Sequence, residues 1–200
     1  MLMIKELVLA TQNQDKGREL AALLGDLGIT IRTLKEFPDV PEVVEDGATC
    51  EANAIKKARA IADHTMLPAV ADDTGLMVDA LNGRPGVHAA RYAGEKATYD
   101  DNCRKLLQEL NGVPRAKRSA RFVTVAALAK PGDACATVLE GALEGMITEM
   151  PAGTQGFGYD PVFFVPELGK TLAQLSPDEK NRISHRARAF GKLKELLKKL

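Results

Sequence analysis

The order of apolar and polar residues predicts that strands and helices alternate from the start of the chain. Leu7-Val8-Leu9-Ala10 is a short apolar run typical of a buried strand, and it gives way to the polar residues Thr11-Gln12-Asn13. Over residues 16–24 the apolar residues recur at helical spacing, and residues 25–28 end that pattern with two glycines. This segment therefore predicts a strand, a polar turn and a helix.

The next part of the chain predicts a second strand, a long loop and an Ala-rich helix. Ile29-Thr30-Ile31 is the strand, and residues 37–47 form a loop rich in proline and acidic residues. Thr49 opens a helix through residue 61, in which nearly every residue has high helix propensity. Residues 68–71 are then a short strand that runs into Asp72-Asp73-Thr74-Gly75, which we interpret as lying at a turn.

The second half of the chain predicts a helix followed by several strands. Residues 100–110 are expected to be helical. The β-branched segments 121–128 and 136–147 are expected to be strands on either side of a Pro131-Gly132-Asp133 turn, and residues 161–165 form a further strand.

The final helix has two candidate starting points. Ser176 is followed by Pro177 at the first helical position and by Glu179, which completes a capping box. Ser184 is the alternative start. The sequence that follows is amphipathic, with its leucines expected in the core and its lysines on a solvated face.

Together these elements predict an α/β fold with a mixed sheet, because strands and helices are intermixed and two of the strands form a hairpin. The chain has 200 residues, of which 45% are hydrophobic and 27% are charged. That length and composition are typical of a soluble globular protein with one core, so we expect a single domain over residues 1–200.

Charge and cysteine content exclude several classes of protein. Lys+Arg and Asp+Glu balance at 27 each, which argues against a general nucleic-acid binder. Cys50, Cys103 and Cys135 have no metal-ligand spacing and are odd in number, so a reducing cytosol fits. Met1-Leu2-Met3-Ile4 meets Lys5-Glu6 before a long apolar run develops, and no stretch of ~18 apolar residues follows. We therefore expect a cytoplasmic protein without an export signal or membrane span.

A candidate anion site lies at the first strand-to-helix turn. In Thr11-Gln12-Asn13-Gln14-Asp15-Lys16, backbone N–H groups at the positive end of a helix would lie beside the Lys16 ammonium. The glycine spacing of a Walker loop is absent. A polar turn with a solvated lysine is the alternative interpretation.

Two acidic clusters offer oxygen ligands for a metal ion. They are Glu45-Asp46-Gly47 and Asp72-Asp73-Thr74-Gly75, each next to a predicted turn. Magnesium commonly takes one or two carboxylates and completes its shell with water and phosphates, so two such clusters facing one cleft would suffice. The alternative is that these residues only form turns.

Residues 153–161, GTQGFGYDP, combine three glycines with two aromatic rings and an acid. Glycines let the backbone approach a ligand closely, and Phe157 can stack on a planar base, a contact of ~1–3 kcal/mol. A hairpin turn that buries two aromatic rings is the alternative.

Lys180, His185 and Arg186 lie near the start of the last helix and are candidate ligand contacts, although an isolated histidine is more often structural.

In their order along the chain, these motifs resemble the inosine triphosphate pyrophosphatase family over essentially the whole sequence. The resemblance implies two α/β lobes around an elongated mixed β-sheet with flanking helices, an active cleft between the lobes, and a homodimer. It also implies magnesium-dependent hydrolysis of non-standard purine nucleoside triphosphates (ITP, dITP, XTP) to the monophosphate and pyrophosphate. The motifs that carry it are TQNQDK at 11–16, EDG at 45–47, ADDTG at 71–75, PGVHAARY at 85–92, GFGYDP at 156–161, and Lys180 with SHR at 184–186.

The same resemblance implies roles for individual residues. Asp73 is the general base, and Glu45 and Asp73 hold magnesium. Lys16 cradles the phosphates, and Phe157 stacks on the purine. The implied substrate-binding set is Thr11, Gln12, Asn13, Gln14, Asp15, Lys16, Thr74, Phe157, Gly158, Tyr159, Asp160, Lys180, His185 and Arg186, with Lys57, Asp72 and Arg91 as further candidates. Asp72 is expected to fix the turn.

Base selection is expected to follow from hydrogen-bond donors. Arg186 would donate to the 6-oxo edge of the purine, and ATP, which carries a 6-amino group instead, would leave that donor unpaired. Otherwise Arg186 pairs with an acidic side chain and only stabilises the final helix.

Two residues depart from the family pattern, and two other functions stay open. Gln12 stands where many relatives carry Gly or another small residue. Ala52 precedes Asn53 where relatives usually carry Glu, so Glu51 or Glu45 must compensate if that glutamate supports the metal. The alternatives are a Maf-like pyrophosphatase for modified nucleotides and a non-catalytic nucleotide-binding regulator. The GFGYDP and SHR motifs favour the first function, and the intact pair Glu45 and Asp73 argues against the regulator.

Overall fold

The computed structural model describes residues 4–199. Met1 to Met3 and Leu200 lie outside these residues, and with them most of the segment on which the expected absence of an export signal depends. Of the helices between residues 4 and 199, none has the length and apolar character needed to cross a membrane.

Among the described residues, eight strands form one sheet in the order β2-β1-β3-β5-β6-β7-β8, with β4 paired to β3. β1 runs parallel to both β2 and β3, whereas β4, β7 and β8 join by antiparallel pairing. The predicted α/β class with a mixed sheet is therefore confirmed. The strands are β1 (Glu6–Leu9), β2 (Thr30–Thr33), β3 (Ala69–Val78), β4 (Pro85–Gly86), β5 (Ser119–Ala129), β6 (Thr137–Ile147), β7 (Phe163–Val165) and β8 (Lys170–Thr171).

The helices begin where the sequence places capping residues. α1 (Gln14–Leu24) is capped by Asn13, and α2 (Cys50–Thr65) is capped by Thr49, whose hydroxyl accepts the N–H of Ala52. α3 (Tyr99–Glu109) opens with a Thr98–Asp101 capping box. α2, which the sequence predicted to end at residue 61, continues to Thr65.

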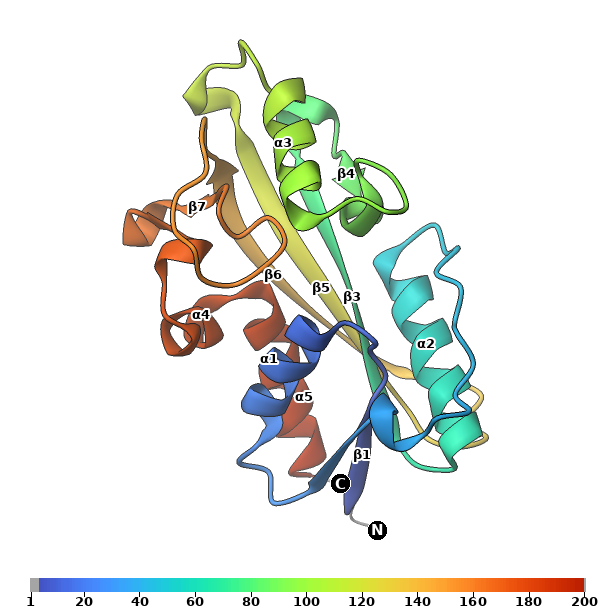
Figure 1. The fold of residues 1–200 in the computed structure, drawn as a ribbon. Coiled ribbons are helices and arrows are strands. Elements are labelled where there is room, and N and C mark those ends of the chain that lie inside the picture. Colours follow the sequence, from blue (N-terminus) through green and yellow to red (C-terminus); the bar gives the residue numbers. More distant parts are fainter. Residues whose placement is uncertain (1–3, 200) are drawn as a thin grey trace. The chain divides into compact units, whose positions relative to one another are not determined.

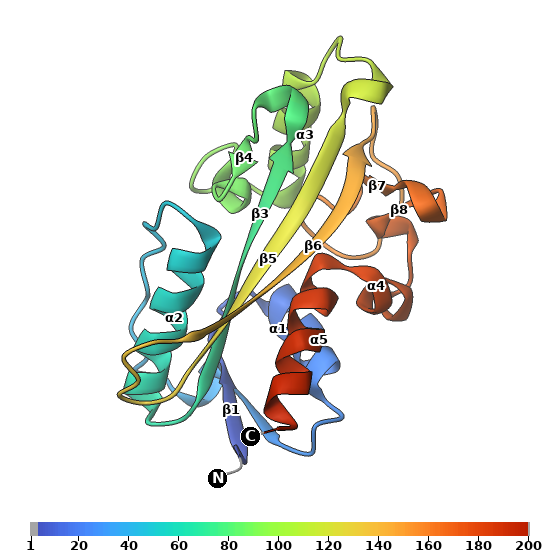
Figure 2. The same ribbon diagram turned by 180° about the vertical axis from the view of Figure 1, so that it is seen from behind.

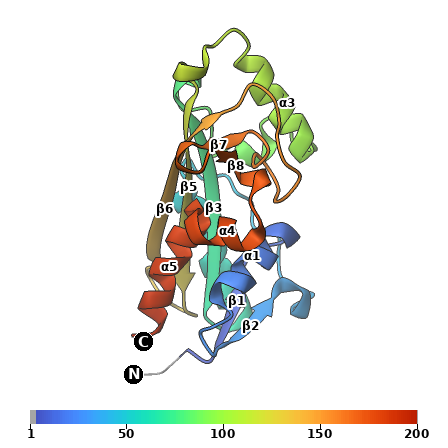
Figure 3. The ribbon, with the colours of Figure 1, turned by 90° about the vertical axis from the view of Figure 1, so that its left-hand side faces the viewer.

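Both candidate starts near the C-terminus are used. Ser176 caps α4 (Pro177–Ile183) through the predicted box with Glu179. α4 stops at Ser184, and α5 (His185–Leu197) begins immediately after it. Figure 3 shows α4 and α5 as separate helices. Ser176 and Ser184 therefore each precede a helix of their own.

The expected turn at residues 72–75 is wrong, because β3 runs without interruption through them. Asp72 and Asp73 are both buried in the middle of this strand. Charged residues are rare at such positions unless they are paired. They are tolerated here because lysine and arginine side chains from other elements meet them. The sequence predicted that Asp72 fixes a turn, and this prediction is wrong. Asp72 instead lies between two cations.

The chain divides into two compact units, each with its own core. Among the described residues, unit 1 consists of residues 4–73, 124–141 and 186–199, and unit 2 consists of Thr74–Val123 and Ala142–His185. In unit 1 the core joins β1, α1 and α5, for example through Leu7, Leu20 and Phe190. In unit 2 Phe163 and Leu106 lie in a core built around α3 and β7. The single domain over residues 1–200 and the cleft between lobes stay predictions.

Helices cover both faces of the strands in unit 1. Leu7 and Leu9 point into the core shared with α1 and α5, and Val8, which points to the opposite face, is also fully buried. Figures 1 and 2 show α1 and α5 side by side on one side of these strands and α2 on the other. Neighbouring residues of β3 can therefore meet different helices.

Candidate active site

The turn before α1 is shaped by its own side chains. The Thr11 hydroxyl accepts the N–H of Asn13, at 3.2 Å. The Asn13 side-chain oxygen accepts the N–H groups of Asp15 and Lys16, at 2.9 and 3.1 Å. Two of the backbone donors expected to bind an anion are thus engaged by the cap. Gln12 and Gln14 are exposed, and Asp15 is half-buried in the first turn of α1.

Asp72 is surrounded by cationic groups from three parts of the chain. Its Oδ2 lies 3.1 Å from Lys16 Nζ and 3.3 Å from Arg186 Nε. Arg186 also pairs with Glu19, at 2.6 Å. Burial acts to raise the pKa of Asp72, but Lys16, Arg186 and Lys57 outweigh it and hold the pKa well below its usual range. Asp72 is therefore a charged structural centre of unit 1.

Asp73 has a different environment. Its Oδ2 accepts a hydrogen bond from Asn53 Nδ2 at 3.1 Å, and its Oδ1 lies 4.0 Å from Lys57 Nζ. Burial raises the pKa of Asp73 above its ordinary value, although Lys57 and Lys16 act in the opposite direction. The carboxylate of Glu45 also raises it. A carboxylate with a raised pKa is a better proton acceptor than an ordinary aspartate.

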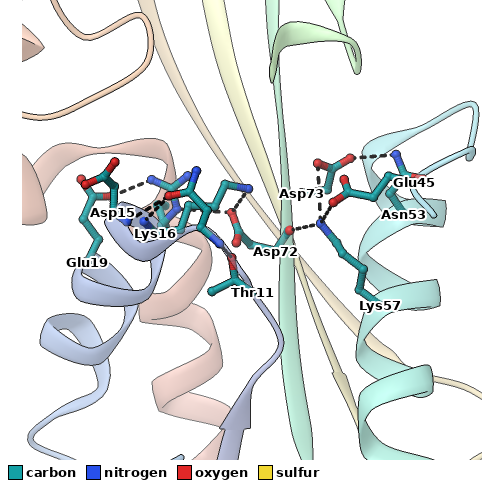
Figure 4. A network of polar contacts seen from close by, with 11 residues as sticks. Thr11, Asp15, Lys16, Glu19, Glu45, Asn53, Lys57, Asp72 and Asp73 are labelled. Carbon is teal, nitrogen blue, oxygen red and sulfur yellow. Dashed lines mark hydrogen bonds and ion pairs between the residues drawn. The ribbon is translucent and has the colours of Figure 1, made fainter. Parts of the chain in front are cut away.

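The two aspartates point to opposite faces because they are consecutive in a strand. Figure 4 shows Asp72 directed toward Lys16 on the side of α1, and Asp73 directed toward Glu45 and Asn53 on the side of α2. Lys57 bridges the two positions, since its Nζ donates to the Asp72 carbonyl oxygen at 2.7 Å and also lies near Asp73.

Glu45 and Asp73 share one cation. Lys57 Nζ lies 3.1 Å from Glu45 Oε1 and 4.0 Å from Asp73 Oδ1. Within residues 4–199, no three His, Cys, Asp or Glu side chains gather closely enough to hold a metal by themselves. Two carboxylates fit magnesium if water and phosphate oxygens complete its shell, which is the usual way that proteins bind this ion.

In unit 2 the segment 156–160 is organised by Asp160. Its Oδ2 accepts the N–H of Phe157 at 2.9 Å and the ammonium of Lys180 at 2.5 Å. A Cβ at Gly156 would lie 2.0 Å from the same oxygen, and the φ of +74° there also favours glycine. The buried Lys180 ammonium further lies 4.7 Å from the centre of the Phe157 ring. Phe157, Asp160 and Lys180 thus form one contact group.

Gly158 and Tyr159 attach this segment to its surroundings. The Tyr159 hydroxyl donates to the Ala89 carbonyl at 2.8 Å, and the Cys103 thiol donates to the Gly158 carbonyl at 3.3 Å. Burial raises the pKa of Tyr159, so its hydroxyl remains a donor. The ring of Tyr99 lies 5.8 Å from that of Phe157. Both Tyr99 and Cys103 belong to α3, which supports the segment from one side.

Three further predicted residues have contacts or positions of their own. His185 is buried and stacks on Phe122, with ring centres 4.4 Å apart. Thr74 follows Asp73 in β3 and is half-buried. Arg91 lies near His88, at 3.3 Å, and pairs with Glu95, at 3.6 Å.

Sequence reasoning missed Asn53 and Glu19. Asn53 precedes Lys57 by four residues, so both lie on the same face of α2 and reach the Asp73 carboxylate. That spacing was readable in the sequence. Glu19 reaches Arg186 across most of the chain length, and no local pattern indicates such a pair.

Comparisons with known proteins agree with the motifs. The sequence matches the model of the Ham1 family over residues 7–196. It is 53% identical over 192 residues to a dITP/XTP pyrophosphatase of Geobacillus kaustophilus, covering 96% of this chain and 94% of that protein. It is also 53% identical over 191 residues to a dITP/XTP pyrophosphatase of Geobacter sulfurreducens, covering 96% of each.

Solved structures give the same result. A HAM1 protein from Coxiella burnetii superposes with a TM-score of 0.89 at 45% identity, covering 99% of this chain and 100% of that one. The Staphylococcus aureus Ham1 protein superposes with a TM-score of 0.85 at 40% identity, covering 97% and 98%. With a family match over nearly all of its length, this chain belongs to the Ham1 family.

Proposed function

We propose that this chain hydrolyses non-standard purine nucleoside triphosphates, among them dITP, ITP and XTP, to the monophosphate and pyrophosphate. The observation that carries the proposal is the pair Glu45 and Asp73, held around the single ammonium of Lys57. The names of relatives about half identical to this chain over nearly its full length support the same activity.

The residues of unit 1 suit attack by water on a phosphate. Hydrolysis needs a positioned water, a base for its proton and cations beside the phosphate oxygens. Asp73 serves as the base, and its burial supports that role. Lys16 and Lys57 provide fixed positive charge for the phosphate groups. Glu45 and Asp73 would hold magnesium, which when bound acidifies water and neutralises phosphate charge.

The residues of unit 2 suit binding of the base. Phe157 stacks on the purine, and Lys180 contributes an ammonium that Asp160 holds in place. His185 and Arg186 are the further candidates for its edge. The ion pairs of Arg186 with Asp72 and Glu19 match the alternative, structural role that the sequence left open. A direct contact between Arg186 and a 6-oxo group stays a proposal.

Location and assembly belong to the same proposal: a cytoplasmic enzyme that removes these nucleotides from the pool and acts as a homodimer. The balanced charge of the chain supports a small-molecule substrate over nucleic acid. The Maf-like activity and the silent regulator are less well supported, because relatives named for dITP and XTP match the chain end to end.

One assay tests the proposed function. Purified protein is incubated with ITP, dITP, XTP, ATP, GTP and UTP, with magnesium or with a chelator, and the products are separated. We expect monophosphate and pyrophosphate in equal amounts from the first three nucleotides, and only with magnesium. Orthophosphate as the product would refute the proposal. Binding of ITP without turnover would indicate the regulator instead.

A further inference from the structure

Asn53 connects the two acidic segments of unit 1. Its side chain is 1% exposed. Its Oδ1 accepts the backbone N–H of Gly47 at 2.8 Å, and its Nδ2 donates to Asp73 Oδ2 at 3.1 Å. Because Gly47 follows Glu45 by two residues, one amide group ties the loop that carries Glu45 to the strand that carries Asp73. Figure 4 shows Asn53 between these two elements.

The orientation of this amide is fixed by its partners. A backbone N–H can only donate, so the end of Asn53 that faces Gly47 must be the oxygen. The NH₂ end then faces Asp73. An aspartate at position 53 could accept from Gly47 but could not donate to Asp73. The arrangement therefore requires an amide, not merely a polar side chain of this size.

The approach of the loop to Asn53 is close. A Cβ at Gly47 would lie 2.6 Å from Asn53 Oδ1 and 2.9 Å from the Ala52 Cβ. Real Cβ atoms do not come so near, so any larger residue at position 47 pushes the loop away from α2. The small residues Gly47 and Ala52 thus permit the contact that Asn53 makes.

From these contacts we infer that Asn53 is a positioning residue that sets the separation and orientation of the Glu45 and Asp73 carboxylates. The inference rests on the proposed function of those two groups. Asn53 and Lys57 lie one turn apart on α2, so the helix presents a neutral donor and a cation to Asp73, and Lys57 also reaches Glu45. The neutral donor holds Asp73 Oδ2, whereas Oδ1 is the oxygen that faces Lys57.

The chain offers a matched control in unit 2. Asn102 on α3 is 2% exposed, accepts the N–H of Ala93 at 2.8 Å and donates to the Ala90 carbonyl at 3.0 Å. It is therefore a second buried asparagine that ties a loop to a helix with two hydrogen bonds. Its partners are backbone groups, not carboxylates.

The test compares Asn53→Ala with Asn102→Ala. Each loses two buried hydrogen bonds, so each should lower the midpoint of thermal unfolding by a similar amount, ~4 °C. Only Asn53→Ala should weaken binding of Mn²⁺, titrated without nucleotide and followed by electron paramagnetic resonance, by ~10–100-fold. The magnesium concentration for half-maximal ITP turnover should rise in parallel, while KM for ITP at saturating magnesium stays within about 2-fold.

If Asn53→Ala does not fold, a second pair of variants tests the same inference. Gly47→Ala leaves Asn53 in place but displaces the loop, and it should weaken metal binding in the same way. Gly191→Ala in α5 is its control, since a Cβ there meets nothing within 4 Å. Unchanged Mn²⁺ affinity in folded Asn53→Ala or in Gly47→Ala overturns the inference. If instead wild type shows no turnover of ITP, dITP or XTP, the proposed function fails, and the Mn²⁺ titration still decides the role of Asn53.

Discussion

The two sides of β3 near Asp72 and Asp73 differ in how their charges are balanced. On the side of α1, Asp72 meets the cations Lys16 and Arg186 at 3.1 and 3.3 Å. On the side of α2, Asp73 and Glu45 are two carboxylates near the ammonium of Lys57. On the first side the two cations are matched by two carboxylates, Asp72 and Glu19, whereas on the second side two carboxylates lie beside Lys57. The proposed magnesium ion would therefore bind on the second side, where two carboxylates face the Lys57 ammonium.

The largest expected effect is on turnover through Asp73. Asp73→Asn should keep the fold and lower kcat for ITP by a factor of about 10²–10⁴, the usual contribution of a positioned base. The measurement is initial rates of pyrophosphate release with circular dichroism as the control for folding. A folded Asp73→Asn with wild-type turnover would remove this residue from the mechanism.

The matching change on the other side of the strand should act on stability. Asp72→Asn removes the buried carboxylate that the half-buried Lys16 and the buried Arg186 share, which should cost ~3–5 kcal/mol in the free energy of unfolding. Asp73→Asn should change that free energy far less in metal-free buffer. Chemical denaturation of both variants checks this contrast. Equal losses of stability would mean that the two faces are not distinct.

Substitution of Arg186 tests whether the side of β3 that faces α1 also contributes to recognition of the purine base. Arg186→Ala should lower the melting temperature, because Asp72 and Glu19 lose a partner. If its guanidinium also donates to a 6-oxo group, as the resemblance implies, the ratio of kcat/KM for ITP to that for ATP should fall as well. An unchanged ratio in a folded variant assigns Arg186 a structural role alone.

The smallest expected effect is stabilisation by magnesium. At a concentration of 100 times Kd, an ion that binds only the folded protein adds about 2.7 kcal/mol to the free energy of unfolding. Wild type should show a rise in melting temperature with magnesium. Asp73→Asn should show little or none, and Lys192→Ala, a change far from the carboxylates in sequence, should respond like wild type.

Much of the fold was readable from local signals. Asn13, Thr49 and Ser176 cap helices as their types predict, and the strands around residues 121–128 and 136–147 are present. The turn at Asp72 was wrongly predicted because two adjacent aspartates with a nearby glycine are more typical of a turn than of the interior of a strand. Partners from distant parts of the chain make the charged strand interior stable: Lys16 and Arg186 pair with Asp72, and Asn53 and Lys57 contact Asp73.

The candidate site was predictable in type but not in arrangement. Motif order indicated Glu45 and Asp73, and the resemblance added Lys57 as a further candidate, yet neither could indicate that this lysine contacts both carboxylates. Asn53 was passed over because an asparagine early in a helix is usually explained by local hydrogen bonding. Its actual partners, Gly47 and Asp73, are respectively before and well after it in the chain. Such long-range pairing is set by packing.

Under the proposed base-binding role of residues 156–160, the shared oxygen of Asp160 limits which positions can be redesigned. Its Oδ2 serves both the Phe157 N–H and the Lys180 ammonium, and it also leaves no room for a side chain at Gly156. Three of these positions are therefore mutually dependent, and a library that varies any one of them would contain mostly misfolded loops. The hydrogen bond of Phe157 to Asp160 comes from its backbone, so another aromatic ring at this position keeps that bond and can keep the contact with the Lys180 ammonium. A substrate-range library should begin with that ring.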